Sequence, residues 1–134
     1  MGEANGPEHP KGAADVPPAA DKTVAAVIGE IVWLMSQSPE FKQYLIADLD
    51  WLVMPPVLLR QFRLFYHEGK PAACVLWAKV SDEVEARLSA GAPTVRPADW
   101  RSGERFRIVR TIAPFGGGEA FAAETERSLA PPAG

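Results

Sequence analysis

The sequence predicts an α+β fold, a sheet flanked by helices, and three observations support it. Apolar residues recur with the helical period over residues 23–36. Residues 58–67 alternate, and the turn HEGKP separates them from the apolar run 72–80, which predicts an antiparallel hairpin. The central part of residues 98–115 is a third strand pattern, and three glycines lead from it into a last helix. The predicted order is therefore ααββαβα.

The first helix is predicted from Thr23 to Ser36. Its apolar positions follow the spacing i, i+3, i+4, i+7 and are Val24, Val27, Ile28, Ile31, Leu34 and Met35. Trp33 falls nearly opposite this stripe. It is therefore either a half-exposed aromatic residue packed by a neighbouring element or a contact for a partner protein.

A short second helix is predicted after Ser38. This serine is a good N-cap, Pro39 fits the first helical position, and Glu40 is favoured at the positive end of the helix. The sequence MPP at 54–56 is expected to end any helix there.

The second half of the chain holds one more helix and the third strand. Ser81 is predicted to cap a helix that ends near Gly91. Alternation along the following strand would put Arg105 and Arg107 on one face of the sheet and Arg110 on the other. A buried arginine needs an acid or a phosphate beside it, so these arginines are expected in ion pairs or against a phosphate.

Three glycines, Gly116, Gly117 and Gly118, lie between this strand and the last helix. Backbone N–H groups at such a place can bind the phosphate of a cofactor. The run matches neither of the established glycine-rich phosphate motifs, so a plain strand-to-helix turn is the other interpretation.

Other reactive side chains are few. Cys74 lies among Ala, Val and Leu, which is typical of a small buried hydrophobic residue rather than of a thiol nucleophile. His67 lies at the hairpin turn and is expected in solvent. No pair of histidines has metal-ligand spacing, so no metal is expected.

Composition narrows the function classes. The 134 residues are enough for one domain, with 47% hydrophobic residues and a net charge of −3. This balance gives no reason to expect nucleic acid. A single cysteine favours a reducing, cytoplasmic setting, and no segment is predicted to be a signal peptide or to span a membrane.

The two ends differ in composition from the middle. Residues 1–21 are rich in Pro, Ala, Gly and charge, so they are expected to be disordered alone or ordered by a partner. Residues 22–128 are predicted to form the domain, and residues 129–134 a flexible tail.

Five motifs, in this order and at this spacing, resemble the toxin-activating lysine acyltransferases of the RTX protoxins. They are GEIVWLMSQSP, MPPVLLRQF, KPAACVLWAKVS, ADWRSGER and IAPFG. The resemblance covers about residues 29–128. It implies a fold similar to the GNAT acetyltransferases, a dimer, and transfer of a fatty acyl group from acyl-carrier protein to a lysine of the toxin. The segment IAPFGGG would face the acyl-phosphopantetheine arm.

The sequence departs from this family at both catalytic positions. The catalytic histidine of the family follows a Ser-Pro-x step, and Phe41 stands there; its catalytic acid lies two residues before IAPFG, and Arg110 stands there. Phenylalanine cannot accept a proton, and arginine stays protonated. The family also continues for about a third of its length beyond this point, so a partly truncated antiparallel or mixed sheet with an open edge is expected.

The sequence therefore favours a catalytically degenerate family member, either an accessory subunit of a larger complex or an acyl-carrier-binding protein. It would be cytoplasmic or peripheral on a membrane-bound complex. Partner or homodimer contacts are expected at Trp33, Trp100 and Arg110, at the open edge and at the N-terminal tail. The first alternative is an active protein-lysine acyltransferase that relies on proximity and on N–H donors of Gly116–Gly118. The second is a regulator that binds acyl-CoA or acyl carrier.

Overall fold

A computed structural model describes residues 22–129; the two tails predicted from the sequence, residues 1–21 and most of 129–134, lie outside the described residues. The centre of the fold is a three-stranded antiparallel sheet in the order β1-β2-β3. Its strands are β1 (Phe62–His67), β2 (Lys70–Val80) and β3 (Arg105–Ile112). The α+β class and the hairpin predicted from the sequence are confirmed.

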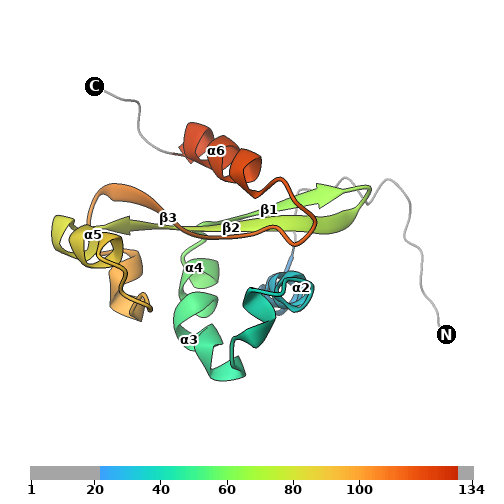
Figure 1. Ribbon diagram of the computed structural model, residues 1–134, viewed down its shortest axis with the longest axis horizontal. Coiled ribbons are helices and arrows are strands. Elements are labelled where there is room, and N and C mark those ends of the chain that lie inside the picture. The colour runs from blue at the N-terminus through green and yellow to red at the C-terminus, as the bar shows by residue number, and fades with distance from the viewer. Residues whose placement is uncertain (1–21, 130–134) are drawn as a thin grey trace.

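Helices cover both faces of this sheet, as Figure 1 shows. One face carries α2, α3, α4 and α5, whereas α6 lies alone across the other. The helices are α2 (Val24–Ser36), α3 (Leu49–Leu52), α4 (Met54–Leu58), α5 (Asp82–Ser89) and α6 (Gly118–Leu129). Three short 3-10 helices connect them: η2 (Phe41–Gln43), η3 (Ile46–Asp48) and η4 (Pro97–Trp100).

The α2 helix forms where the sequence predicts it. The Thr23 hydroxyl oxygen accepts a hydrogen bond from the N–H of Ala26 at 3.1 Å, which satisfies a free donor of the first turn. The buried stripe of the helix packs against the sheet and consists of Val27, Ile31, Leu34 and Met35. Hydrophobic burial on this face therefore supplies most of the core.

Three boundaries differ from those predicted. As expected, α3 ends just before MPP, at Leu52, but Pro55 and Pro56 also lie in the first turn of a new helix, α4, because a proline in the first turn lacks an N–H that would have no partner there. The strand predicted from residue 58 begins at Phe62 instead, since Leu58 closes α4. The last helix extends to Leu129, one residue into the predicted tail.

The arginines of β3 do not alternate as predicted. Arg110 pairs with Leu76 and Ile108 with Trp77, so Val109 is an extra residue, a β-bulge. Residues directly opposite one another share a face. The bulge therefore places Arg110 on the same face as Arg107 and Arg105, which simple alternation could not reveal.

The end of this face is tied to α5 by ion pairs. The Ser81 hydroxyl oxygen caps the helix by accepting from the N–H of Val84 at 3.1 Å. Arg105 pairs with Asp82 at 2.8 Å, and Arg107 with Glu85 at 2.9 Å. The predicted cap and the predicted ion pairs are confirmed for these two arginines.

Candidate functional site

A hollow of about 340 Å³ brings together two segments that lie far apart in the sequence. One segment follows α2, and the other runs from the end of β3 into α6. Its lining residues are Ser38, Glu40, Phe41, Thr111, Ala113, Gly118, Glu119 and Ala122. The first substituted family position therefore lies beside the strand and glycine turn that the sequence singled out.

Phe41 is held in place by the turn before it. The Ser38 side chain is buried, and its hydroxyl oxygen accepts from the Phe41 N–H at 3.3 Å. The Phe41 ring is 3% exposed and stacks on Tyr44 with a centroid distance of 5.6 Å. This residue is a hydrophobic wall of the hollow and has no group that transfers protons.

Arg110 turns away from the hollow. Its guanidinium donates to the carbonyl oxygen of Val109 at 2.9 Å and to that of Pro93 at 3.4 Å. Among residues 22–129 no carboxylate forms an ion pair with it, so the predicted acid partner is not found there. Its neighbour Thr111 lines the hollow instead.

The glycine turn has a structural reason for two of its glycines. Gly116 and Gly117 have φ values of 101° and 81°, in the left-handed region that favours glycine. A Cβ on Gly117 would also lie 3.3 Å from the ring of Phe121. The strand-to-helix turn therefore requires these residues whether or not a phosphate binds. Glu119 occupies the first turn of α6, where its negative charge meets the positive helix end and disfavours a phosphate.

The two tryptophans proposed as partner contacts lie in different places. Trp33 is 42% exposed and lies 5.9 Å from the exposed ring of Phe115, so it remains a surface aromatic residue. Trp100 is fully buried, and its indole N–H donates to the Trp51 carbonyl oxygen at 2.9 Å. The proposal that Trp100 contacts a partner is therefore corrected, because this residue belongs to the core.

Asp99, next to Trp100, is the buried acid of the ADW motif. Burial works to raise its pKa, but hydrogen bonds from Arg87 and Arg96 outweigh it and hold the pKa of Asp99 below its ordinary value. The carboxylate also accepts from the Arg96 N–H at 2.9 Å. It fixes the loop before β3 and lies outside the hollow.

Cys74 and His67 are also outside the hollow. Cys74 is fully buried as predicted, and burial raises the pKa of its thiol well above the ordinary range. His67 is exposed, with Glu68 at 3.6 Å. Within residues 22–129 no cluster of His, Cys, Asp or Glu is arranged to hold a metal ion.

Two carboxylates in the hollow escaped the sequence analysis as a pair. Glu40 and Glu119 both line it, although 79 positions separate them in the chain. Each glutamate adjoins a feature that the sequence singled out: Glu40 precedes Phe41, and Glu119 follows the glycine run. Only the fold shows that the two features meet.

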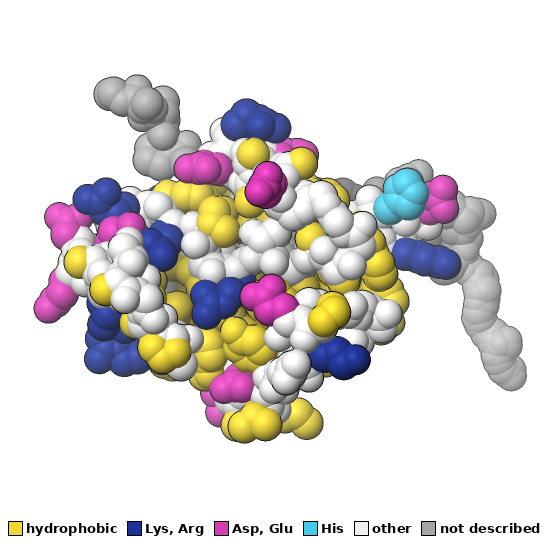
Figure 2. All heavy atoms as spheres, in the orientation of Figure 1, with side chains coloured by type: hydrophobic (Ala, Val, Ile, Leu, Met, Phe, Trp, Pro, Cys, Tyr) yellow, Lys and Arg dark blue, Asp and Glu magenta, His cyan; other side chains and the backbone are white. Residues whose placement is uncertain are grey.

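Over the wider surface, Figure 2 shows acidic and basic side chains interspersed on the visible face.

The hollow lies where two motifs of the acyltransferase resemblance converge. The chain belongs to the RTX toxin acyltransferase family, whose sequence model matches residues 20–132. The family recognised from the motifs is thus confirmed.

The sequence is also similar to those of several individual proteins. A lysine-acyltransferase RtxC of Vibrio cholerae is 33% identical over 79% of this chain and 70% of its own length. The RTX-II toxin-activating lysine-acyltransferase ApxIIC of Actinobacillus pleuropneumoniae is 36% identical over 67% of this chain and 56% of its own length. An uncharacterized protein of Synechocystis is 27% identical over 84% of this chain and 78% of its own. The match therefore spans little more than half of the Actinobacillus protein.

No helix in residues 22–129 combines the length and the apolar character that a membrane crossing requires.

Proposed function

We propose that this chain is a non-catalytic member of its family that binds a protein partner, with acyl-carrier protein as the first candidate. The observation that carries the proposal is the buried Phe41 ring in the hollow, at the position where the resemblance expects the catalytic histidine. The hollow is bounded by the end of β3 and by Gly118 of the glycine turn. It therefore supports recognition better than it supports proton transfer.

The chemistry explains why Phe41 matters. An acyl transfer to lysine requires that the ammonium group first lose a proton to a base. The guanidinium of an arginine has only hydrogen-bond donors, and that of Arg110 donates to two carbonyl oxygens. His67 is not among the residues that line the hollow. Neither residue supplies the missing base.

Family membership also supports a GNAT-like arrangement, in which β3, the glycine turn and α6 form the wall for the acyl-phosphopantetheine arm. The hollow beside this wall has a volume of about 340 Å³. A cytoplasmic location and a homodimer belong to the same proposal, since both are what the family resemblance implies.

An active protein-lysine acyltransferase is the second candidate, and one observation favours it. Glu40 and Glu119 place two carboxylates in the hollow, and a carboxylate positioned near an ammonium group can accept its proton. They would also attract the positive charge of a lysine side chain. In this case a glutamate of the hollow would act as the base in place of the histidine.

One experiment separates the two candidates. The full chain is incubated with a fatty acid carried on acyl-carrier protein and a lysine-containing peptide, with the Vibrio relative as positive control, and acylation is followed by mass spectrometry. The proposal expects no transfer above the rate without protein. Transfer by the full chain that Glu40→Gln or Glu119→Gln removes would establish the second candidate instead.

Binding is measured in parallel, because absence of transfer alone does not show a binding function. The proposal expects acyl-carrier protein to bind the full chain in titration calorimetry. Phe41→Ala would enlarge the hollow and change this affinity, whereas Leu45→Ala, at an exposed residue outside the lining, would leave it unchanged. If no acyl-carrier protein bound, the first candidate partner would be wrong.

A further inference from the structure

A second hollow, of about 120 Å³, lies between α2, α4 and β1. It shares no lining residue with the hollow beside Phe41. Its walls are apolar and consist of Val24, Val27, Val57, Leu58 and Phe62. Since a cavity needs only about 10–15 Å³ to take up one water, it has room for several carbon atoms.

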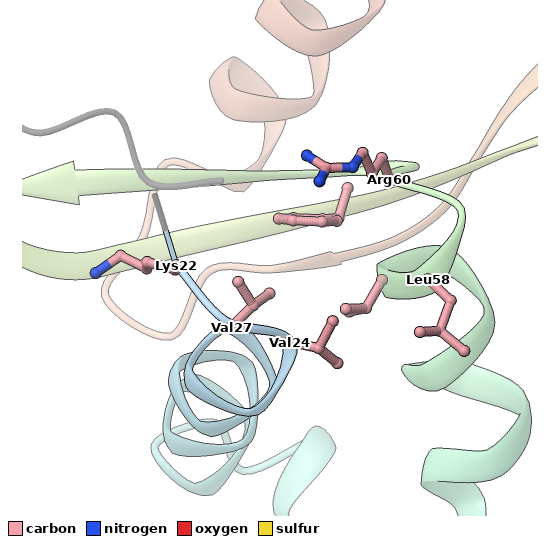
Figure 3. Close-up of a pocket in the computed structure, with 7 residues that line it drawn as sticks. Lys22, Val24, Val27, Leu58 and Arg60 are labelled. Carbon is pink, nitrogen blue, oxygen red and sulfur yellow. The ribbon is translucent and has the colours of Figure 1, made fainter. Parts of the chain in front are cut away.

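Two cations complete the lining of this hollow, Lys22 and Arg60. Figure 3 shows Lys22 at the start of α2 and Arg60 in the turn before β1. The Lys22 ammonium is already paired with Glu30 at 2.9 Å. Arg60 forms no ion pair with any residue in the range 22–129. Its positive charge is thus the one that the described residues leave uncompensated at the hollow.

The backbone of Arg60 is unusual for an arginine. Its φ is 61°, in the left-handed region. The N–H of Arg60 donates to the Val57 carbonyl oxygen at 3.1 Å, and that of Gln61 donates to Pro56 at 2.7 Å. This is the Schellman ending of a helix, in which glycine is the preferred residue. Any side chain at this position costs stability, so the arginine is not there for the turn.

A cation near a helix C-terminus is favourable, but α4 has only five residues, so this gain is small. The exposed walls add a second unexplained cost. Val24 is 44% exposed and Leu58 is 62% exposed, and both lie at the same hollow as the unpaired guanidinium. An apolar chain and an anionic group on one molecule would satisfy both features at once.

We propose that this hollow binds a small amphipathic anion, a carboxylate or phosphate on a short alkyl chain. The alkyl chain packs between Val24, Val27 and Phe62. The anionic group accepts hydrogen bonds from the guanidinium of Arg60. The inference goes beyond the proposed function, because no residue of the acyltransferase-like hollow takes part.

Hexanoate is the probe that tests this proposal. Hexanol is the control ligand that has the same alkyl chain but no charge, and acetate is the control ligand that has the carboxylate but almost no alkyl chain. Titration of the full chain, followed by NMR or calorimetry, should show hexanoate binding more tightly than either control ligand. Arg60→Gly should weaken hexanoate binding about tenfold, the loss of one charge-assisted hydrogen bond. The same substitution relieves the left-handed strain, so the melting temperature should rise. Loss of binding cannot then be attributed to unfolding.

A matched pair on α2 tests the apolar wall. Val24→Glu puts a carboxylate at the hollow and should abolish hexanoate binding, whereas Ala25→Glu adds the same charge one position on, at an exposed residue outside the lining, and should preserve it. Both acids lie in the first helical turn, where they are favourable. Equal binding of hexanoate and hexanol would overturn the proposal, and so would binding that survives Arg60→Gly or Val24→Glu unchanged.

Discussion

The two faces of the sheet are held in different ways. The face under α2 and α4 buries Ile31, Leu34 and Leu76 completely. The opposite face is covered by α6 alone, which packs on β2 and β3 and is joined to β1 by the Phe65–Phe121 ring pair and the Arg63–Glu124 ion pair, at 4.6 and 2.9 Å. One face therefore determines stability, while the other is a thin layer that shapes the candidate site with little cost to the fold.

The largest expected effect is in the core, where two tryptophans form a matched pair. Trp100→Ala should lower the free energy of unfolding by about 3–5 kcal/mol, because it leaves a cavity. Trp33→Ala, at an exposed position, should lower it by about 1 kcal/mol or less. Urea denaturation measures both. Equal losses would contradict the placement of Trp100 in the core and of Trp33 at the surface.

The next effect concerns Asp99 and has a pH dependence. Asp99→Asn should lower the free energy of unfolding at pH 7 by about 1.5–3 kcal/mol, since hydrogen bonds between charged partners are lost. The pKa of Asp99 is lowered in the folded protein. Its contribution is therefore present above the ordinary Asp pKa of about 3.9 and is lost as the pH falls through the folded value.

Denaturation at pH 7 and at pH 3 checks this sign. The wild-type protein should lose more stability between these conditions than Asp99→Asn does, because the variant no longer has this group to protonate. A variant with the same pH dependence as the wild type would contradict the assignment.

A smaller effect is expected on the α6 face. Phe121→Ala removes a half-buried ring that packs on Phe65, and should lower the free energy of unfolding by about 1–2 kcal/mol. Hydrogen exchange should show faster exchange in α6 while α2 stays protected. Loss of protection in both helices at once would show that the α6 layer is not a separate, weaker unit.

The smallest effects are expected from two glycines and have opposite signs. Gly117→Ala should destabilise by about 1 kcal/mol, because its φ is left-handed and its Cβ would meet Phe121. Gly29→Ala should stabilise by roughly 0.5–1 kcal/mol, since a Cβ at this position of α2 meets nothing within 4 Å. Thermal melting resolves the two directions.

Local patterns in the sequence were enough to predict most elements of the fold. The helical period predicted α2, and the capping residue Ser81 predicted α5, because these signals act within a few turns. That Thr23 caps α2 was seen only in the structure. Pro55 was misread, since a proline that stops one helix can equally begin another. The burial of Trp100 depends on Trp51, 49 residues away, and no local pattern contains that information.

The candidate site was predicted only in part. The motifs identified Phe41, Arg110 and the glycine run, and the structure brings Phe41 and the glycine run together. The direction of Arg110 depends on a bulge, which hydrophobic alternation does not encode. The second hollow was missed altogether, because its left-handed arginine is a property of the backbone and leaves no trace in composition.

The extra residue at Val109 acts as a phase shift in the strand. Before the bulge, the odd-numbered residues Arg105 and Arg107 face α5. After it, the even-numbered residues take that face, so that Thr111 and not Arg110 is opposite Val75, on the α6 face. Regular pairing of every residue, without the bulge, would set Val109 opposite Leu76 and Arg110 opposite Val75. The guanidinium of Arg110 would then take the place of Thr111 beside Gly118, and a fixed positive charge would lie at the hollow whose lining now has a threonine and two glutamates.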